Sequence, residues 1–342
     1  MVILAGAGVG VLALTGNAAK IPLINRIPGL SPAAEQKRTR PPTCPLTGVA
    51  SHHRVPDRPA LAIKVENLPE ARPQAGLQKA DVVYEEPVEG GITRFIVVYQ
   101  CQDADRVGPV RSARLTDPDV LVQFGTSTLF GYAGGVPKVE QAVARMGLHD
   151  VNYDVKAAID EKAYVRDPDR SEPHNLYAST GGLYRAGNED AGKPAPVFTF
   201  RVKPPHGAKR VHSVHLDWSA TSNVYWTWSS GRGAWMRSYD TGPAVLEGDL
   251  QISAVNVVVQ VVKVEDTGIV DVAGNPSPEV VSVGSGKAYV FRNGRMIVGT
   301  WKRRSVQALT KFYGPDGKRI PLAPGRTWVE LLPDTVPVET SR

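Results

Sequence analysis

The fold is decided by the stretch Ile92-Thr93-Arg94-Phe95-Ile96-Val97-Val98-Tyr99-Gln100-Cys101. Both alternating faces of this run are apolar, which predicts a central strand covered on its two sides. The run Asp81-Val82-Val83-Tyr84-Glu85 precedes it, and Gly90-Gly91 stands between the two as a tight turn. We therefore expect these two runs to form a β-hairpin.

Further elements extend outward from this hairpin over residues 48–193. Residues 61–65 (LAIKV) read as another strand. Helices are expected at 117–124 after a Thr116 cap, at 138–146 between Pro137 and Gly147, and at 179–185. This region is therefore predicted to be a mixed α/β domain.

Short strands without helices follow the proline-rich seam at residues 193–196. Asn293-Gly294 and Asp316-Gly317 are typical hairpin turns among them. The expected strands are 197–201, 213–218, 224–228, 235–239, 256–265, 287–291, 296–301 and 328–332. We predict the fold class α+β, with the mixed domain over 48–193 followed by an all-β domain over 194–335.

The amino-terminal residues 1–19 carry no charged side chain and read as a signal peptide or membrane anchor. A buried amino-terminal helix is the alternative. The positive flank follows the apolar segment instead of preceding it, which suggests that the true start lies upstream. Residues 20–47 are a basic, proline-rich linker.

The charge of the chain is concentrated at this end. Of 40 basic and 34 acidic residues, residues 1–58 hold seven basic and two acidic ones. The remainder is nearly neutral and lacks the clustered cations that nucleic-acid binding needs, so we expect no nucleic-acid partner. The basic segment is interpreted as a solvated tether or as a juxtamembrane stretch attracted to anionic headgroups.

The chain has two cysteines, Cys44 and Cys101. An even number in an exported protein predicts a disulfide, which would tie the end of the linker to the central strand. Two buried thiols are the alternative.

Polar residues gather in loops next to the predicted strand ends of the mixed domain, where a rigid sheet can position binding groups. Arg111 and Arg114 flank Ser112 and follow a Gly-Pro turn, a pattern that can clamp a phosphate or carboxylate. Arg72 and Arg94 would complete the clamp if their loops converge. Structural ion pairs with the nearby acidic residues Glu85, Glu86, Glu89 and Asp117 are the competing interpretation.

These motifs make the chain resemble the YerB-like bacterial envelope lipoproteins, a family of unknown function. The resemblance rests on segments 67–77, 89–95, 108–114, 173–177, 284–288, 299–303 and 324–328. It implies an extracytoplasmic, membrane-tethered protein with two family domains and no established reaction. No cysteine follows the apolar segment where such lipoproteins carry their lipid, so a peptide anchor or secretion replaces lipidation in our expectation.

Candidate site residues follow from these loops. The expected ligand-binding residues are Asn67, Arg72, Glu89, Arg94, Arg111, Ser112, Arg114, Arg170 and Asn175. His174 could carry a proton with a carboxylate such as Glu85 or Asp117, which would allow hydrolysis of a glycosidic or phosphodiester bond. A hydrogen-bonded structural histidine is the alternative.

Other sites are weakly indicated. His212 and His215 would face opposite sides of a strand, and His52-His53 lies at the end of the linker, so we expect no metal and no cofactor. Trp226 and Trp228 share one strand face, either as stacking platforms for sugar rings or as core residues.

The sequence as a whole predicts a membrane-tethered envelope protein, anchored or secreted outside the cytoplasm. Its ligand would be anionic or hydroxyl-rich, such as a cell-wall glycopolymer or a lipid-phosphate precursor, which it could hydrolyse or transfer. The alternative is a non-catalytic scaffold that docks another envelope protein through an edge or aromatic patch of the β domain.

Overall fold

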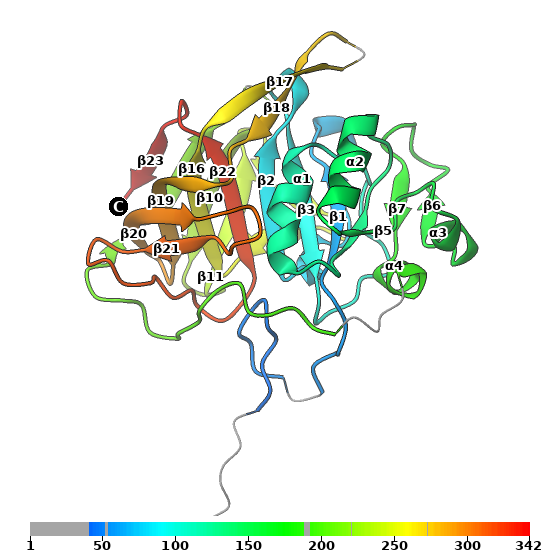
Figure 1. The fold of residues 1–342 in the computed structure, drawn as a ribbon. Coiled ribbons are helices and arrows are strands. Elements are labelled where there is room, and N and C mark those ends of the chain that lie inside the picture. The colour runs from blue at the N-terminus through cyan, green and yellow to red at the C-terminus, as the bar shows by residue number, and fades with distance from the viewer. Residues whose placement is uncertain (1–40, 52–53, 188–191, 220, 272) are drawn as a thin grey trace, which may run out of the picture. The chain divides into compact units, whose positions relative to one another are not determined.

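The computed structural model describes residues 41–342 except 52–53, 188–191, 220 and 272. The predictions for residues 1–19, and for the linker up to residue 40, lie outside the described residues. Within them, the fold is α+β: a mixed sheet with helices in the first half of the chain and mostly strands in the second (Figure 1).

One large sheet runs through both halves of the described chain. From edge to edge it contains β21 (Lys311–Tyr313), β20 (Arg295–Arg303), β19 (Gly284–Arg292), β16 (Asn256–Val262), β22 (Thr327–Pro333), β2 (Val82–Pro87), β3 (Thr93–Tyr99), β1 (Leu61–Glu66), β4 (Leu129–Gly131) and β5 (His149–Asp150). β8 (Lys209–Arg210) pairs with β20. The parallel pairing of β2 with β22 joins the halves.

The hairpin expected around Gly90-Gly91 is confirmed. β2 and β3 pair antiparallel, with Val83 opposite Val97, and all seven residues of β3 are buried. A short 3-10 turn, η3 (Glu89–Gly91), connects them, and Gly90 and Gly91 both take positive φ, which glycine adopts without strain. The doubly apolar run is therefore a strand with packed layers on both faces.

Helices and a second sheet provide those layers. Ala62, Ile96 and Val98 pack with α1 (Thr116–Leu121) and α2 (Pro137–Arg145), which lie in front of β1–β3 in Figure 1. The opposite face packs on α3 (Lys156–Asp160), α4 (Thr180–Gly187) and the second sheet. Further 3-10 turns are η1 (Pro69–Ala71), η2 (Leu77–Lys79) and η4 (Val122–Phe124).

The second sheet consists of the strands that follow residue 210, together with the last strand of the chain. Its order is β12 (Gly242–Pro243), β11 (Ala234–Tyr239), β10 (Asn223–Ser229), β9 (Ser213–Asp217) and β23 (Val338–Ser341), and β15 (Ser253–Ala254) pairs with β11. Three two-stranded ribbons complete the described structure: β13 (Val245–Leu246) with β14 (Leu250–Gln251), β17 (Val264–Val270) with β18 (Pro276–Val280), and β6 (Tyr164–Arg166) with β7 (Leu176–Ala178).

Three local predictions need correction. Residues 197–201 form no strand and make one isolated bridge, from Phe200 to Leu322. Thr116 does not cap α1 but lies inside it, and its hydroxyl accepts the N–H of Val280 at 3.0 Å. The predicted strand 256–265 is divided, because β16 ends at Val262 and β17 belongs to a separate ribbon.

The tryptophans pack in the core. Trp226, Trp235 and Trp328 are fully buried and Trp301 nearly so. Trp226 packs edge-on against Trp328 at 5.2 Å between ring centroids, and Trp228 is partly buried on the same core. The interpretation of Trp226 and Trp228 as a sugar-stacking platform is therefore wrong, because the second sheet turns their shared face inward.

A disulfide joins Cys44 to Cys101, with Cα atoms 6.0 Å apart and a sequence separation of 57. It ties the start of the described chain to the residue two places beyond the end of β3.

Candidate functional site

Two buried polar clusters lie at the same end of the central strands, one on each face of the sheet. Cross-strand pairing sets Arg94 of β3 opposite both Glu66 of β1 and Glu86 of β2, so these three side chains share one face. Glu85 projects to the other face. The period of two along each strand thus separates neighbouring glutamates into different environments.

The loop after β3 brings two more arginines to the Arg94 face. Its backbone is held beside β1, since Glu66 N–H donates to Pro109 O and Arg111 N–H to Lys64 O. Ala113 N–H donates to Gly134 O on the other side. We call Arg94, Arg111 and Arg114 the arginine cluster.

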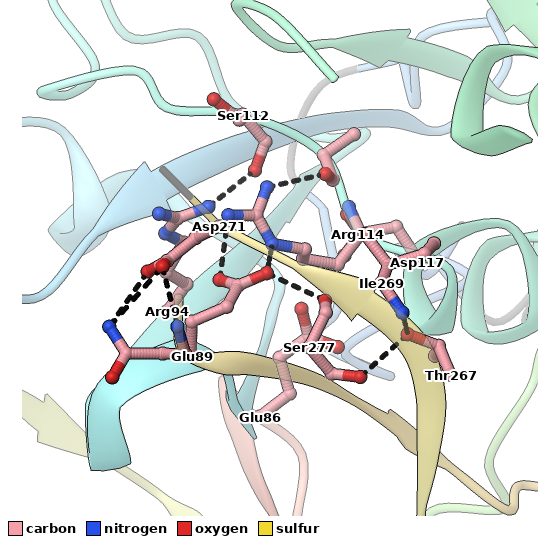
Figure 2. A network of polar contacts seen from close by, with 12 residues as sticks. Glu86, Glu89, Arg94, Ser112, Arg114, Asp117, Thr267, Ile269, Asp271 and Ser277 are labelled. Atoms are coloured by element: carbon pink, nitrogen blue, oxygen red, sulfur yellow. Dashed lines mark hydrogen bonds and ion pairs between the residues drawn. The ribbon is translucent and has the colours of Figure 1, made fainter. Parts of the chain in front are cut away.

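Two glutamates bind this cluster. Arg111 Nε lies 3.0 Å from Glu66 Oε1. Arg114 Nη2 lies 2.6 Å from Glu89 Oε2 (Figure 2). Ser277 of β18 donates to the other oxygen of Glu89 at 2.6 Å. Although burial opposes ionisation of Glu89, the hydrogen bonds from Arg114 and Ser277 hold its pKa below the usual value.

Arg94 differs from its two neighbours. Its guanidinium donates to the backbone oxygen of Ser112 at 3.0 Å, but no carboxylate of the described residues forms an ion pair with it, and its Nε has no hydrogen-bond partner there. Burial, together with the charges of Arg114 and Arg111, lowers the pKa of Arg94 to about 10. Among the described residues, Arg111 and Arg114 each form an ion pair with a glutamate and Arg94 forms none, while the Asp271 carboxylate acts on Arg114 through its charge.

His174 reaches the cluster from the loop before β7. Its Nδ1 lies 2.8 Å from Glu66 Oε2, so Glu66 connects the imidazole to Arg111. Glu66 is fully buried, whereas 21% of the His174 side chain and 25% of the Arg111 side chain are exposed. This arrangement orients the ring through one nitrogen and leaves the other available for proton transfer.

A buried cluster with one amine and two carboxyl groups lies beneath the arginines. Lys64 Nζ contacts Glu86 Oε1 and lies 2.7 Å from Asp117 Oδ1, and all three side chains are fully buried. Asp117 Oδ2 also accepts the N–H of Arg114 at 2.6 Å. Burial and the Asp117 charge raise the pKa of Glu86 to about 8, although Lys64 acts in the opposite direction.

The cluster on the opposite face centres on Arg237 of β11. Its Nη1 and Nη2 lie 2.7 and 3.0 Å from the Glu85 oxygens, and Nη1 lies 3.3 Å from Glu330 Oε1. Despite the opposing effect of burial, the Arg237 charge holds the pKa of Glu85 below its usual value. Burial and the Glu85 charge raise that of Glu330.

Neither carboxylate proposed as the partner of His174 contacts it. Glu85 is fully buried on the opposite face of the sheet, where it binds Arg237. Asp117 is also fully buried, and its carboxylate binds Lys64 Nζ and the backbone N–H of Arg114. The carboxylate that contacts His174 is Glu66. The sequence feature that could have indicated Glu66 is the alternation along β1, which places Lys64 and Glu66 on the same face of the strand.

The remaining predicted ligand residues do not converge on one site. Arg72 stacks on Tyr239, with 3.7 Å from Cζ to the ring centroid, and donates to Asn67 O. Asn67 belongs to the Glu85 face, where it donates to Thr93 Oγ1 at 2.8 Å. Arg170 donates hydrogen bonds to the backbone oxygens of Glu70 and Pro73. Asn175 accepts a hydrogen bond from Arg166. The convergence of Arg72 with the other arginines is therefore not observed.

The families of these two halves are recognisable. The description "Protein of unknown function (DUF3048) N-terminal domain" matches residues 46–193, and its C-terminal counterpart matches residues 214–329. The chain belongs to the DUF3048 family. The arginine cluster of this DUF3048 protein and the loops that carry it lie within the first match.

Two comparisons place the DUF3048 protein beside YerB of Bacillus subtilis. It is 29% identical over 317 residues to the protein of strain 168 described as "Putative lipoprotein YerB", covering 88% of this chain and 91% of that one. The crystal structure of YerB from Bacillus subtilis superimposes with a TM-score of 0.71 at 26% identity, covering 87% of this chain and 99% of the other.

The described residues of the DUF3048 protein include neither a helix that could span a membrane nor a cluster of metal ligands. None of its described helices has the length and apolarity required to cross a membrane. No group of three or more histidine, cysteine, aspartate or glutamate residues in the described part of the chain could hold a metal ion. His52 and His53 lie outside that part.

Proposed function

We propose that this DUF3048 protein is an extracytoplasmic envelope protein, tethered at its amino terminus, whose arginine cluster binds the anionic group of a cell-wall glycopolymer or of its lipid-phosphate precursor. The uncharged segment 1–19 and the similarity to a protein described as a lipoprotein support the location. The observation that carries the ligand is Arg94, a guanidinium without a carboxylate partner among the described residues, beside Arg111 and Arg114.

A phosphate or carboxylate would complete this arrangement. Guanidinium groups bind such anions with two parallel N–H donors, and the bonds strengthen where water is excluded. Arg111 and Arg114 are partly exposed, with side-chain exposures of 25% and 15%, so a ligand can reach them. Arg94 lies behind them and would add its charge without itself facing solvent.

The Glu66–His174 pair adds a proton-transfer group beside the anion site. In the hydrolytic form of the proposal, His174 takes a proton from a water molecule while the water oxygen bonds to phosphorus. The bond from phosphorus to the leaving sugar oxygen breaks, and that oxygen takes the proton from His174. Glu66 acts here as a positioning residue, since it contacts only the imidazole and Arg111.

Ligand binding is tested by thermal unfolding of the full chain with inorganic phosphate, sugar phosphates, a short polyprenyl phosphate and wall fragments. A ligand at 100 times its Kd stabilises the native state by about 2.7 kcal/mol. We expect the stabilisation to persist in Arg185→Ala, which loses an exposed ion pair with Glu161 elsewhere, and to be lost in Arg111→Ala. No stabilisation by any probe, or equal loss in both variants, would contradict the anion site.

Turnover is tested separately with phosphodiester-linked wall fragments. His174→Gln is expected to keep the ligand-induced stabilisation and to abolish release of the cleaved product. Glu66→Gln should lower kcat because the imidazole of His174 loses the carboxylate that orients it, and it should raise KM less than Arg111→Ala does because the guanidinium of Arg111 is retained. Binding without turnover in the wild-type chain would leave the binding function standing and refute the hydrolytic form.

A further inference from the structure

A concave surface lies at the edge of the large sheet that is far from the helices. It measures about 1110 Å³ and lies between the segment 303–309 and the turn at 314–317, across the ends of β20 and β21. Its lining includes the cationic residues Lys302, Arg303, Arg304 and Lys311 and no acidic residue. We call this surface the basic groove.

The basic groove is open because the second sheet does not extend over it. Along β19 and β20, Tyr289, Phe291 and Met296 pack into the core beneath the second sheet. Toward the other end of the hairpin, Lys302 shares that face but is exposed. Tyr313 of β21, opposite Thr300, is half-buried and lies 5.7 Å from Lys302 Nζ, measured from its ring centroid.

The cations of the groove are placed where they repel one another. Lys302 and Lys311 are directly paired across β20 and β21, and like charges at such positions destabilise a sheet. Among the described residues, neither lysine nor Arg304 forms an ion pair. Asp316 in the bordering turn accepts the N–H of Lys318 at 3.1 Å. The fourth cation, Arg303, is buried and donates to Ala308 O and Ser282 Oγ, which shapes the 303–309 wall.

We infer that the basic groove binds an extended polyanion, a chain with repeating phosphate or carboxylate groups. Its volume exceeds the roughly 300–1,000 Å³ of pockets that enclose small molecules. The backbones of neighbouring strands lie about 5 Å apart, which places the paired Lys302 and Lys311 side by side. The two cations can therefore face successive charges of a polyanionic chain. The concave shape of the groove suits a polymer chain lying along it better than a flat membrane surface. This inference is independent of the arginine cluster, which uses other residues.

The test measures binding of linear polyphosphate, of poly-L-glutamate and of phosphatidylglycerol vesicles to the full chain. The variant Lys302→Gln/Arg304→Gln/Lys311→Gln removes the three exposed cations of the groove. The matched control Lys138→Gln/Arg145→Gln/Lys203→Gln removes three exposed cations elsewhere and changes the net charge equally. All six side chains lie on the surface, and thermal unfolding of each variant verifies that it is folded.

We expect the groove variant to bind at least one polymer with about a tenfold higher Kd, if each contact contributes a factor of roughly two. The control should bind as the wild type does, and Lys302→Arg/Lys311→Arg should retain affinity. Preference for polyphosphate or polyglutamate identifies the anionic group. Equal weakening in both triple variants, no binding of either polymer, or groove-dependent binding only to phosphatidylglycerol vesicles would overturn the inference.

Discussion

Replacing Arg237 by methionine should destabilise the protein strongly, and the structure sets the size of the effect. Arg237, Glu85 and Glu330 are all fully buried, and three hydrogen bonds join them. Breaking a buried ion pair by removing one partner costs about 3–5 kcal/mol, because a buried charge is left unpaired. Thr93 still donates to Glu85 at 2.7 Å, so we expect a loss near 3 kcal/mol at pH 7.

The pH dependence of this loss follows from the pKa of Glu85. In the wild type Arg237 holds that pKa below 4.5, so the pair contributes stability above about pH 4.5 that is lost as pH falls through the folded-state pKa. In Arg237→Met the same carboxyl is buried without its cation, and its pKa lies above the unfolded value. Its contribution then disappears as pH rises past about 4.5, so the difference between variant and wild type is largest at pH 7.

Urea unfolding followed by tryptophan fluorescence at pH 4 and pH 7 measures both effects. The control Arg185→Met, which breaks an ion pair with 59% of the arginine side chain exposed, should change stability by less than about 1 kcal/mol. Arg237→Met/Glu85→Gln/Glu330→Gln should recover at least half of the loss, because no buried charge remains. A loss below 1 kcal/mol, or one equal at both pH values, would refute this account of the cluster.

Two further predictions concern the backbone. Replacing both cysteines of the Cys44–Cys101 disulfide with serine should lower the free energy of unfolding by about 4 kcal/mol, because the bond closes a loop of 57 residues. Guanidinium unfolding measures this loss. A loss below about 1 kcal/mol would contradict the loop-entropy argument. Gly299→Ala should destabilise the protein by roughly 1–3 kcal/mol, because the added Cβ would lie 2.0 Å from Tyr313 O. In the control Gly231→Ala the added Cβ meets no atom within 4 Å. Equal melting temperatures for the two variants would show that β21 moves aside freely.

Local patterns predicted much of the central sheet. The β2–β3 hairpin and α2 followed from alternation, Gly-Gly and the Pro137–Gly147 boundaries, which are signals contained within about ten residues. The pairing of β2 with β22 was not predictable in this way. It joins Val83 to Trp328 across most of the chain, and no local pattern specifies a parallel partner so distant.

In the candidate site, too, local motifs predicted some of the residues that meet, but not all of them. The Arg111-Ser112-Ala113-Arg114 motif indicated an anion-binding group, and the structure brings Arg94 beside it. Arg72 is expected to join them only if its loop converges with theirs, and Glu85 is expected beside them because it is near in sequence. The sheet lies between Glu85 and the arginine cluster, since adjacent residues of a strand project to opposite faces.

By itself, the sequence determined which residue types were available and which segments became strands and helices, because backbone propensity, alternation and turn chemistry act over a few residues. Only the tertiary structure decided which charges meet. Glu66 binds Arg111 and His174, Glu85 binds Arg237, and Arg94 has no carboxylate partner among the described residues. Coulombic and hydrogen-bonding energies depend on distance in space and on burial, and both are set by packing between segments far apart in the chain.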